Sequence, residues 1–506
     1  DRFHLIRTSG NITGTINQYI LPLLPFGKVW DTSQFLVDGS LKIIQPFVAT
    51  PDRDNIEIQV NSTTTGTQYF YGQNLDAISL LNNGNFVIVW NYGSKIYAQE
   101  FDPQGNKVGN EIIVDDRSSN SEPSVQGLST GGYMVTWRAL ISNRLYKIYG
   151  KIYHADGSIK KEAFEVAGSS SYHYYTPTTT QLKNGTIAIA YYTTKSNNDA
   201  FITLIDTNGE LVQSDIPVNT YTSSYQRLPK IRANKHDSGF VVVWETSGQY
   251  TGYDVMWRAF DEEGTPRTGE VLVNQSYKSG NQYVESVETL DNGHSIVSWR
   301  YSGYTDGNGL LQDTKNNGTY MRELDENGSL VTEETLINTD YTESDQLYSK
   351  IAQIDEDRIM VIWASNNEDG SNYGVFGKVY DLTLNSMSDS FQINQTIGGH
   401  QTTPYIERLD DNSVIIGWND QGGADGNGYG VFAQILRFEA VEKETRIDNN
   451  QTQYKTLPFD ISNDTYEIGV SSNGTLHIGQ FGVVKSNSGI LGSLRGSYGR
   501  LYIKTN

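Results

Sequence analysis

The sequence has 506 residues with 49 glycines, 33 tyrosines and only 12 prolines, a composition typical of many short strands joined by tight turns. A formal net charge of −21 excludes nucleic acid as a partner and disfavours anionic membrane surfaces, and the sequence contains no apolar run long enough to span a bilayer. The lack of cysteine excludes disulfides, thiolate metal sites and cysteine nucleophiles.

Residues 1–53 lack the pattern that fills the rest of the chain. The chain opens on Asp1 rather than Met, so we expect a mature chain whose signal peptide has been removed. An apolar stretch from Tyr19 to Phe26 contains two prolines, which exclude the interior of a helix or a central strand. Because such a stretch aggregates when it is left in water, we expect it to dock on another surface. The residues assigned to this assembly role are Tyr19, Ile20, Leu21, Leu23, Leu24, Phe26 and Trp30.

A short segment recurs seven times between residues 54 and 449, at spacings of 47 to 64 residues. Each copy has a turn-forming residue, then an almost continuously apolar strand that ends six positions later on an aromatic residue. A strand with alternating apolar residues precedes the turn, and two further strands follow the aromatic residue. The seven aromatic residues are Trp90, Trp137, Tyr191, Trp244, Trp299, Trp363 and Trp418.

Each repeat is therefore predicted to be a four-stranded antiparallel meander, which cannot bury both faces of its central strands alone. Seven copies stacked around an axis do bury them, so the sequence predicts an all-β fold, a seven-bladed β-propeller over residues 54–449 with small β segments at both termini. A linear β-solenoid or a pair of sandwiches is the competing interpretation. A degenerate eighth blade starting at Val37–Ile44 is left open.

The repeats resemble those of large secreted adhesins and haemolysin-type surface proteins. The resemblance is carried by segments such as Gly84-Asn-Phe-Val-Ile-Val-Trp90, Tyr97-Ala-Gln-Glu-Phe-Asp-Pro-Gln-Gly105 and Val273-Asn274. It covers residues 54–449 and implies a scaffold or binding platform, without fixing a particular role. The third copy departs from the pattern because Tyr191 replaces the tryptophan, and the last copy lacks its second turn.

Eight segments resemble a fourth strand, one more than seven repeats need. The extra segment is Ile56–Val60, and beside the first three strands of the last copy it would close the ring. The last copy's own candidate, Thr445–Asp448, would then lead into the C-terminal segment 450–506. Strands are expected there at 466–470, 475–484 and 500–504, too few for an independent sandwich.

The terminal segments have two alternatives. They pack on each other, or the tail of one subunit completes the sheet of the next by strand addition. The second alternative makes identical subunits the partners in a head-to-tail filament.

Asparagine is frequent before x-Ser or x-Thr, the pattern of N-glycosylation. Three of these residues, Asn61, Asn274 and Asn394, share one repeat position at the end of the fourth strand, which predicts glycans that radiate from the rim. The alternative is that asparagine simply ends the strand well. The ten candidate positions are Asn11, Asn61, Asn184, Asn274, Asn317, Asn327, Asn394, Asn450, Asn463 and Asn473.

No motif in the sequence predicts catalysis. The histidines are scattered, and the turns lack the Ser-x-Asp-x-Gly-x-Thr-Trp pattern of sialidases, although paired carboxylates could still meet across blades. Acidic loops between the second and third strands offer weak calcium candidates at Asp306, Asp369 and Asp425. We therefore predict no enzyme activity, no catalytic residue, and no cofactor other than a possible Ca²⁺ ion and N-linked glycans.

The leading functional prediction is an extracellular structural glycoprotein at the cell surface that assembles into filaments or a surface layer through its terminal segments. The alternative is a carbohydrate-binding propeller, an adhesin or lectin whose partner is a glycan. A lectin of this kind would carry exposed aromatic side chains, repeated blade by blade, beside polar side chains. A glycosidase ranks last.

Overall fold

The computed structural model describes residues 57–438 apart from 71–75, 118, 142–143, 250–251, 277–279, 303–316, 411 and 427, and outside that range the backbone of short strands near both termini. The chain divides into two compact units. One comprises Thr50–Phe438, and the other combines Asp1–Ala49 with Glu439–Asn506.

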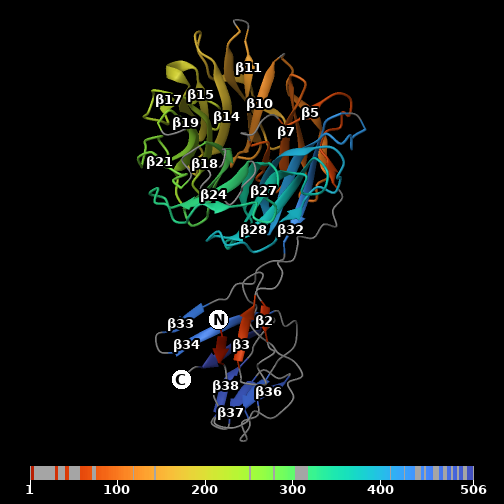
Figure 1. Cartoon of the computed structure of the whole chain (residues 1–506), viewed down its shortest axis with the longest axis vertical. Coiled ribbons are helices and arrows are strands. Elements are labelled where there is room, and N and C mark those ends of the chain that lie inside the picture. Colours follow the sequence, from red (N-terminus) through yellow and green to blue (C-terminus); the bar gives the residue numbers. More distant parts are fainter. Residues whose placement is uncertain are drawn as a thin grey trace. The chain divides into compact units, whose positions relative to one another are not determined.

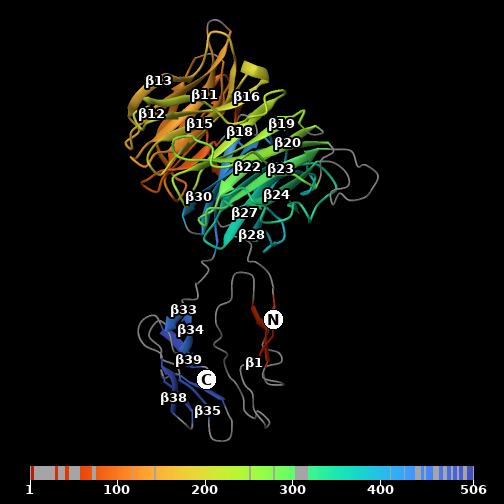
Figure 2. The same ribbon diagram turned by 90° about the vertical axis from the view of Figure 1, so that its left-hand side faces the viewer.

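The larger unit is a seven-bladed β-propeller, as predicted, with its blades arranged in chain order around one axis (Figures 1 and 2). The first blade contains β5 (Gln68–Tyr69) and β6 (Ile78–Leu80), which both pair with β7 (Phe86–Tyr92), then β8 (Lys95–Phe101) and β9 (Lys107–Asp115). The second contains β10 (Asn120–Gly127), β11 (Tyr133–Leu140), β12 (Tyr146–Tyr153) and β13 (Ile159–Ala167). The third contains β14 (Tyr174–Gln181), β15 (Ile187–Thr193), β16 (Asp199–Ile205) and β17 (Leu211–Pro217), with the 3-10 turn η1 at Lys195–Asn197.

The remaining blades follow the same inner-to-outer order. The fourth contains β18 (Gln226–Ala233), β19 (Phe240–Ser247), β20 (Tyr253–Phe260) and β21 (Val271–Leu272). The fifth contains β22 (Asn281–Thr289), β23 (Ser295–Ser302), β24 (Gly318–Leu324) and β25 (Thr335–Leu336). The sixth contains β26 (Gln346–Gln353), β27 (Arg358–Asn366), β28 (Tyr373–Asp381) and β29 (Phe391–Gln392). The seventh contains β30 (Gln401–Asp410), β31 (Ser413–Asp420), β32 (Gly430–Arg437) and β4 (Ile58–Gln59).

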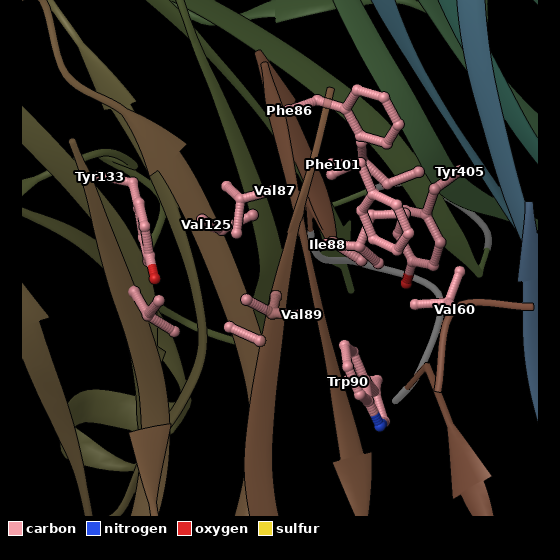
Figure 3. Packing of buried hydrophobic residues seen from close by; sticks show 14 of the residues in the cluster. Val60, Phe86, Val87, Ile88, Val89, Trp90, Phe101, Val125, Tyr133 and Tyr405 are labelled. Carbon is pink, nitrogen blue, oxygen red and sulfur yellow. The ribbon is translucent and has the colours of Figure 1, made fainter. Parts of the chain in front are cut away.

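The second strand of each blade is buried on both faces, which is why it reads as continuously apolar. In β7, Val87 and Val89 face Val125 of the next blade, whereas Ile88 points to the opposite side, towards Tyr405 of the seventh blade (Figure 3). The repeat aromatic residues, Tyr191 included, are no more than 1% exposed. Because burial of one such side chain stabilises the fold by a few kcal/mol, seven of them anchor the contacts between blades.

The ring is closed by a strand from the N-terminal side of the propeller. Strand β4 pairs antiparallel with β32, with Gln59 opposite Phe432 and Ile58 opposite Ala433. This confirms the prediction that Ile56–Val60 supplies the fourth strand of the last blade. A closed ring excludes both the solenoid and the pair of sandwiches.

The second unit contains three sheets, described by their backbone. The N-terminal sheet has the order β1 (Arg2–His4), β3 (Ser40–Ile44), β2 (Val29–Asp31), so the candidate eighth blade belongs to this sheet and not to the propeller. The C-terminal sheets contain β33 (Arg446–Asn449), β34 (Thr452–Phe459) and β39 (Gly499–Lys504), and β36 (Leu476–Gly479), β35 (Glu467–Val470), β37 (Val483–Ser486) and β38 (Gly489–Ser493). As predicted, the segment after the last blade is displaced, because β33 pairs with β34.

Candidate functional site

The innermost strands carry a recurrent irregularity that positions side chains around the axis. In six blades the pairing of the innermost strand with the second strand shifts near its start, as between Arg227 and Lys230 in β18. At five of these shifts a residue other than glycine adopts a positive φ, for example Leu228 at 54°. Such β-bulges bend a strand and redirect its side chains, and they are enriched next to functional sites.

Seven equivalent positions near the far end of the innermost strands meet around the axis. Each of them pairs with a residue of the second strand, the one three positions before the repeat aromatic. Glu288, for example, pairs with Ile296, and Glu407 pairs with Ile415. These positions are mostly polar or charged, which is unusual for the centre of a fold. They are Ser79, Gln126, Thr180, Arg232, Glu288, Ala352 and Glu407.

A cavity of about 450 Å³ opens at this end of the axis and is lined by all seven positions. Its lining also includes Asp76, Lys235, Arg408 and Asp410, so charged side chains of both signs face one space. A volume of this size lies in the range of small-molecule sites. We call it the axial cavity.

Asp76 and Arg232 join the first and fourth blades across the axis. The Arg232 guanidinium donates two hydrogen bonds to the Asp76 carboxylate, at 2.5 and 2.8 Å, and its Nε atom lies 3.6 Å from a carboxylate oxygen of Glu288. The Lys235 ammonium lies 2.6 Å from the other oxygen of Glu288. These contacts hold Asp76 and Glu288 beside fixed positive charges, whereas Glu407 receives one long hydrogen bond, 3.4 Å, from the backbone N–H of Leu80.

The two environments move the pKa values of the carboxyl groups apart. Burial raises the pKa of Glu407 to about 7, and the negative charge of Glu288 adds to the rise although Arg232 opposes it. Burial would also raise the pKa of Asp76, but the charge and hydrogen bonds of Arg232 hold it below its usual range. Because the pKa of Glu407 lies near neutral pH and that of Asp76 lies below its usual range, Glu407 can give up a proton at a pH where Asp76 is ionised, the combination that acid–base catalysis requires.

Two of the three sequence-predicted calcium candidates, Asp369 and Asp425, lie among the described residues. Both oxygens of Asp369 accept hydrogen bonds, from the backbone of Ser371 at 2.9 Å and from the amide of Gln392 at 3.0 Å. Asp425 accepts a long hydrogen bond, 3.5 Å, from Asn61, and Asp306 lies outside the described residues. Among the described residues, no group of three or more histidine or acidic side chains is arranged to hold a metal ion.

The three asparagines at the shared repeat position are at most 2% exposed. Each accepts a hydrogen bond through Oδ1 from a backbone N–H of the third strand, as Asn274 does from Val255 at 2.8 Å, and each donates through Nδ2. The nitrogen that would carry a glycan is thus buried and hydrogen-bonded at Asn61, Asn274 and Asn394. Their geometry is that of the alternative, asparagine as a strand terminator.

The other glycosylation candidates divide into two groups. Asn184 and Asn327 are exposed in hairpin turns, and the Asn317 amide donates a 2.7 Å hydrogen bond to Asp345. Asn11, Asn450, Asn463 and Asn473 lie outside the described residues, as do the assembly candidates from Tyr19 to Phe26. Trp30 lies in β2, where its backbone pairs with Ile43.

No helix in the described parts of the chain has the length and apolar character needed to cross a bilayer.

No protein-family model and no curated protein matches this sequence. Solved structures do match its fold. A polysaccharide lyase of family PL25, an ulvan lyase bound to -[GlcA(1-4)Rha3S]-, aligns with 76% of this chain and 96% of its own at 10% identity and a TM-score of 0.51. A Dyadobacter fermentans protein of unknown function (12% identity, 76% and 98% coverage, TM-score 0.45) and a Penicillium chrysogenum α-L-arabinanase complexed with arabinobiose (12% identity, 77% and 100% coverage, TM-score 0.42) are also similar. At these identities the likeness shows the fold alone.

The ulvan lyase nevertheless corrects the prediction that this chain is not an enzyme. That prediction treated a propeller without a recognisable motif as non-catalytic, and a propeller of the same fold is a lyase. The prediction of no catalytic residue had the same basis. Sequence reasoning missed Asp76, Arg232, Glu288 and Glu407 because it searched for contiguous motifs. A spacing signal was available for two of the four, since Glu288 stands 11 positions before Trp299 and Glu407 stands 11 positions before Trp418. Arg232 and Asp76 do not follow it, because they stand 12 and 14 positions before Trp244 and Trp90.

Proposed function

We propose that this protein is a carbohydrate-active propeller that binds part of a polysaccharide in the axial cavity and cleaves a glycosidic bond there by acid–base chemistry. One observation carries the proposal: two carboxyl groups with pKa values moved in opposite directions, Glu407 upwards and Asp76 downwards, line the same cavity. The ulvan lyase gives a precedent for a polysaccharide-cleaving enzyme with this fold. Glycosidase activity, the function ranked last from the sequence, thus becomes the leading functional proposal.

In this proposal, Glu407 donates its proton to the oxygen of the leaving sugar as the bond between that oxygen and the anomeric carbon breaks. The Asp76 carboxylate, held ionised by Arg232, stabilises the positive charge on the sugar and accepts a proton from the water that adds to the anomeric carbon. Ser79, Gln126 and Thr180, from the first three blades, also line the cavity and supply hydrogen-bonding groups for sugar hydroxyls.

A polysaccharide substrate fits the predicted extracellular location, and glycans at the exposed Asn184 and Asn327 are compatible with it. Nothing in the described residues favours filament assembly, because the apolar stretch on which that hypothesis depends lies outside them. The filament hypothesis keeps its own test, which is electron microscopy of the full chain beside a chain without residues 1–53.

The test of the proposed function is an activity screen against neutral and acidic polysaccharides that measures new reducing ends. Glu407→Gln should lower the rate at least 100-fold because it removes the proton donor, a step worth two orders of magnitude or more. Glu263→Gln, an identical change at an exposed turn residue, should leave the rate unchanged. Equal rates for the wild type and Glu407→Gln would contradict the proposed role of Glu407.

A further inference from the structure

The opposite end of the axis carries a different set of side chains. In each blade, the residue after the repeat aromatic pairs with the second or third residue of the innermost strand, close to where that strand begins. In β18, Arg227 at this end stands five residues before Arg232 of the axial cavity, a separation of roughly 16 Å along a strand. Whatever binds at this end is therefore separate from a ligand in the axial cavity.

Arginine and tyrosine concentrate at these positions in four successive blades. The cross-strand pairs of the second to fifth blades are Ser121 with Arg138, Tyr175 with Tyr192, Arg227 with Glu245, and Tyr283 with Arg300. The other three blades have the pairs Leu347 with Ala364, Thr402 with Asn419, and Tyr69 with Asn91, without a charged residue. This end of the ring is thus asymmetric.

The fourth and fifth blades form the most elaborate part of this surface. The guanidinium of Arg227 lies over the ring of Tyr253 at 4.0 Å, and that of Arg300 lies over the ring of Tyr283 at 4.7 Å. The two tyrosine rings are neighbours, with centroids 5.8 Å apart. We call Arg227, Glu245, Tyr253, Tyr283 and Arg300 the Arg–Tyr cluster.

Two buried polar atoms of the Arg–Tyr cluster have no hydrogen-bond partner among the described residues. One is Oε1 of Glu245, a side chain that is 1% exposed and whose other oxygen accepts a 2.9 Å hydrogen bond from Nε of Arg227. The other is Nε of Arg300. A buried acceptor and a buried donor without hydrogen-bond partners lower the stability of the fold. A ligand that supplies hydrogen bonds to both atoms removes that cost.

The charge of the Arg–Tyr cluster differs from that of the whole chain. Two arginines surround one carboxyl group, whose pKa burial raises to about 7 against the opposing effect of Arg227. A chain of net charge −21 therefore has a locally positive site, which is suited to an anionic group. Tyrosine rings suit the apolar face of a sugar ring, because they offer flat apolar area beside polar groups.

We propose that the Arg–Tyr cluster binds an acidic sugar residue, one that carries a carboxylate or a sulfate. The guanidinium of Arg300 pairs with the anionic group, the rings of Tyr253 and Tyr283 contact the sugar ring, and Oε1 of Glu245 accepts a hydrogen bond from a hydroxyl. This site is independent of cleavage in the axial cavity.

Isothermal titration calorimetry with three probes tests this site: an oligogalacturonate, a sulfated galactan oligosaccharide and a neutral dextran oligosaccharide. We expect the full chain to bind at least one acidic probe at least ten-fold more tightly than dextran. Arg300→Gln should weaken that binding at least ten-fold and Tyr283→Ala should weaken it as well. The carboxylated and sulfated probes distinguish the two sources of negative charge.

Two variants are matched controls. Arg117→Gln removes another arginine stacked on a tyrosine, 4.3 Å from the ring of Tyr149, and should leave acidic-probe binding unchanged. Glu407→Gln should also leave it unchanged, which separates this site from the axial cavity. Thermal unfolding of each variant checks that it folds. Binding of dextran as tight as that of both acidic probes, no binding of either acidic probe, or an equal effect of Arg300→Gln and Arg117→Gln would overturn the proposal.

Discussion

Replacement of Asn274 by alanine tests the structural role of the repeated asparagine. The fourth strand of its blade, β21, has only two residues, and beyond it the Asn274 side chain continues the pairing with β20. Its Oδ1 accepts from the N–H of Val255 and its Nδ2 donates to Asp254, both at 2.8 Å, and the side chain is fully buried. Alanine removes one hydrogen bond from each of two buried groups, the Val255 N–H and the Asp254 carboxylate.

The cost follows from those two groups. Each buried polar group that loses a hydrogen bond costs about 1–3 kcal/mol, so the two together cost about 2–6 kcal/mol. Because the entropy of unfolding is about 2.1 cal/mol/K per residue and the propeller unit spans about 390 residues, a loss of 3 kcal/mol lowers Tm by about 4 °C.

Differential scanning calorimetry of protein from a host that does not N-glycosylate measures this shift free of glycan effects. The matched control is Asn327→Ala, which also removes a glycosylation pattern but at an exposed turn residue, and we expect its Tm to change by about 1 °C or less. An equal, small shift for both variants would refute the reasoning, as would a glycan found on Asn274 of folded protein from a glycosylating host.

Three further predictions concern the axis and the closure of the ring. In a double-mutant cycle, Asp76→Asn and Arg232→Gln should show a coupling energy of about 1–3 kcal/mol. This value lies between those of exposed and buried ion pairs, because about a quarter of each side chain is exposed. Additive effects of the two substitutions on stability would argue against the ion pair. The pKa of Glu407 is about 7 in the folded state, so the free energy of unfolding should fall as pH rises from about 4.5 to 7, by at most about 3 kcal/mol. Glu407→Gln should remove this fall, as measured by denaturant titrations at each pH. The same pH dependence in the variant would contradict the raised pKa. Deletion of residues 54–60 should open the ring, lower Tm by several degrees and expose the last blade to limited proteolysis; an unchanged protease-resistant core would show that β4 does not close it.

The propeller architecture could be predicted from the sequence because each blade is specified by a short local pattern of apolar and turn-forming residues. The strand before each repeat aromatic is apolar on both faces, and the same turn precedes it each time, so every copy reports the same blade. The surplus strand Ile56–Val60 was recognisable for the same reason, since it is one more copy of a known element. Tyr191 fills the place of a tryptophan because it occupies the same buried position.

The candidate site could not be predicted in this way. Asp76 and Arg232 are 156 residues apart and meet only because the ring closes, so no short motif contains both. The bulges that redirect the innermost strands depend on single residues such as Leu228 in an unusual backbone conformation. For Asn274 the sequence left both alternatives open, a rim glycan and a strand terminator, because the glycosylation pattern is the same whether the asparagine points out or inwards. Burial, not sequence, separates the two cases.

A crystal structure of the full chain with a bound oligosaccharide, taken from whichever polysaccharide the activity screen identifies, tests the central claim most directly. The account predicts sugar density in the axial cavity, with a glycosidic oxygen within hydrogen-bonding distance of Glu407 and Asp76 on the other side of the same sugar. Sugar bound only outside the axial cavity, with Glu407 facing empty space, would contradict it.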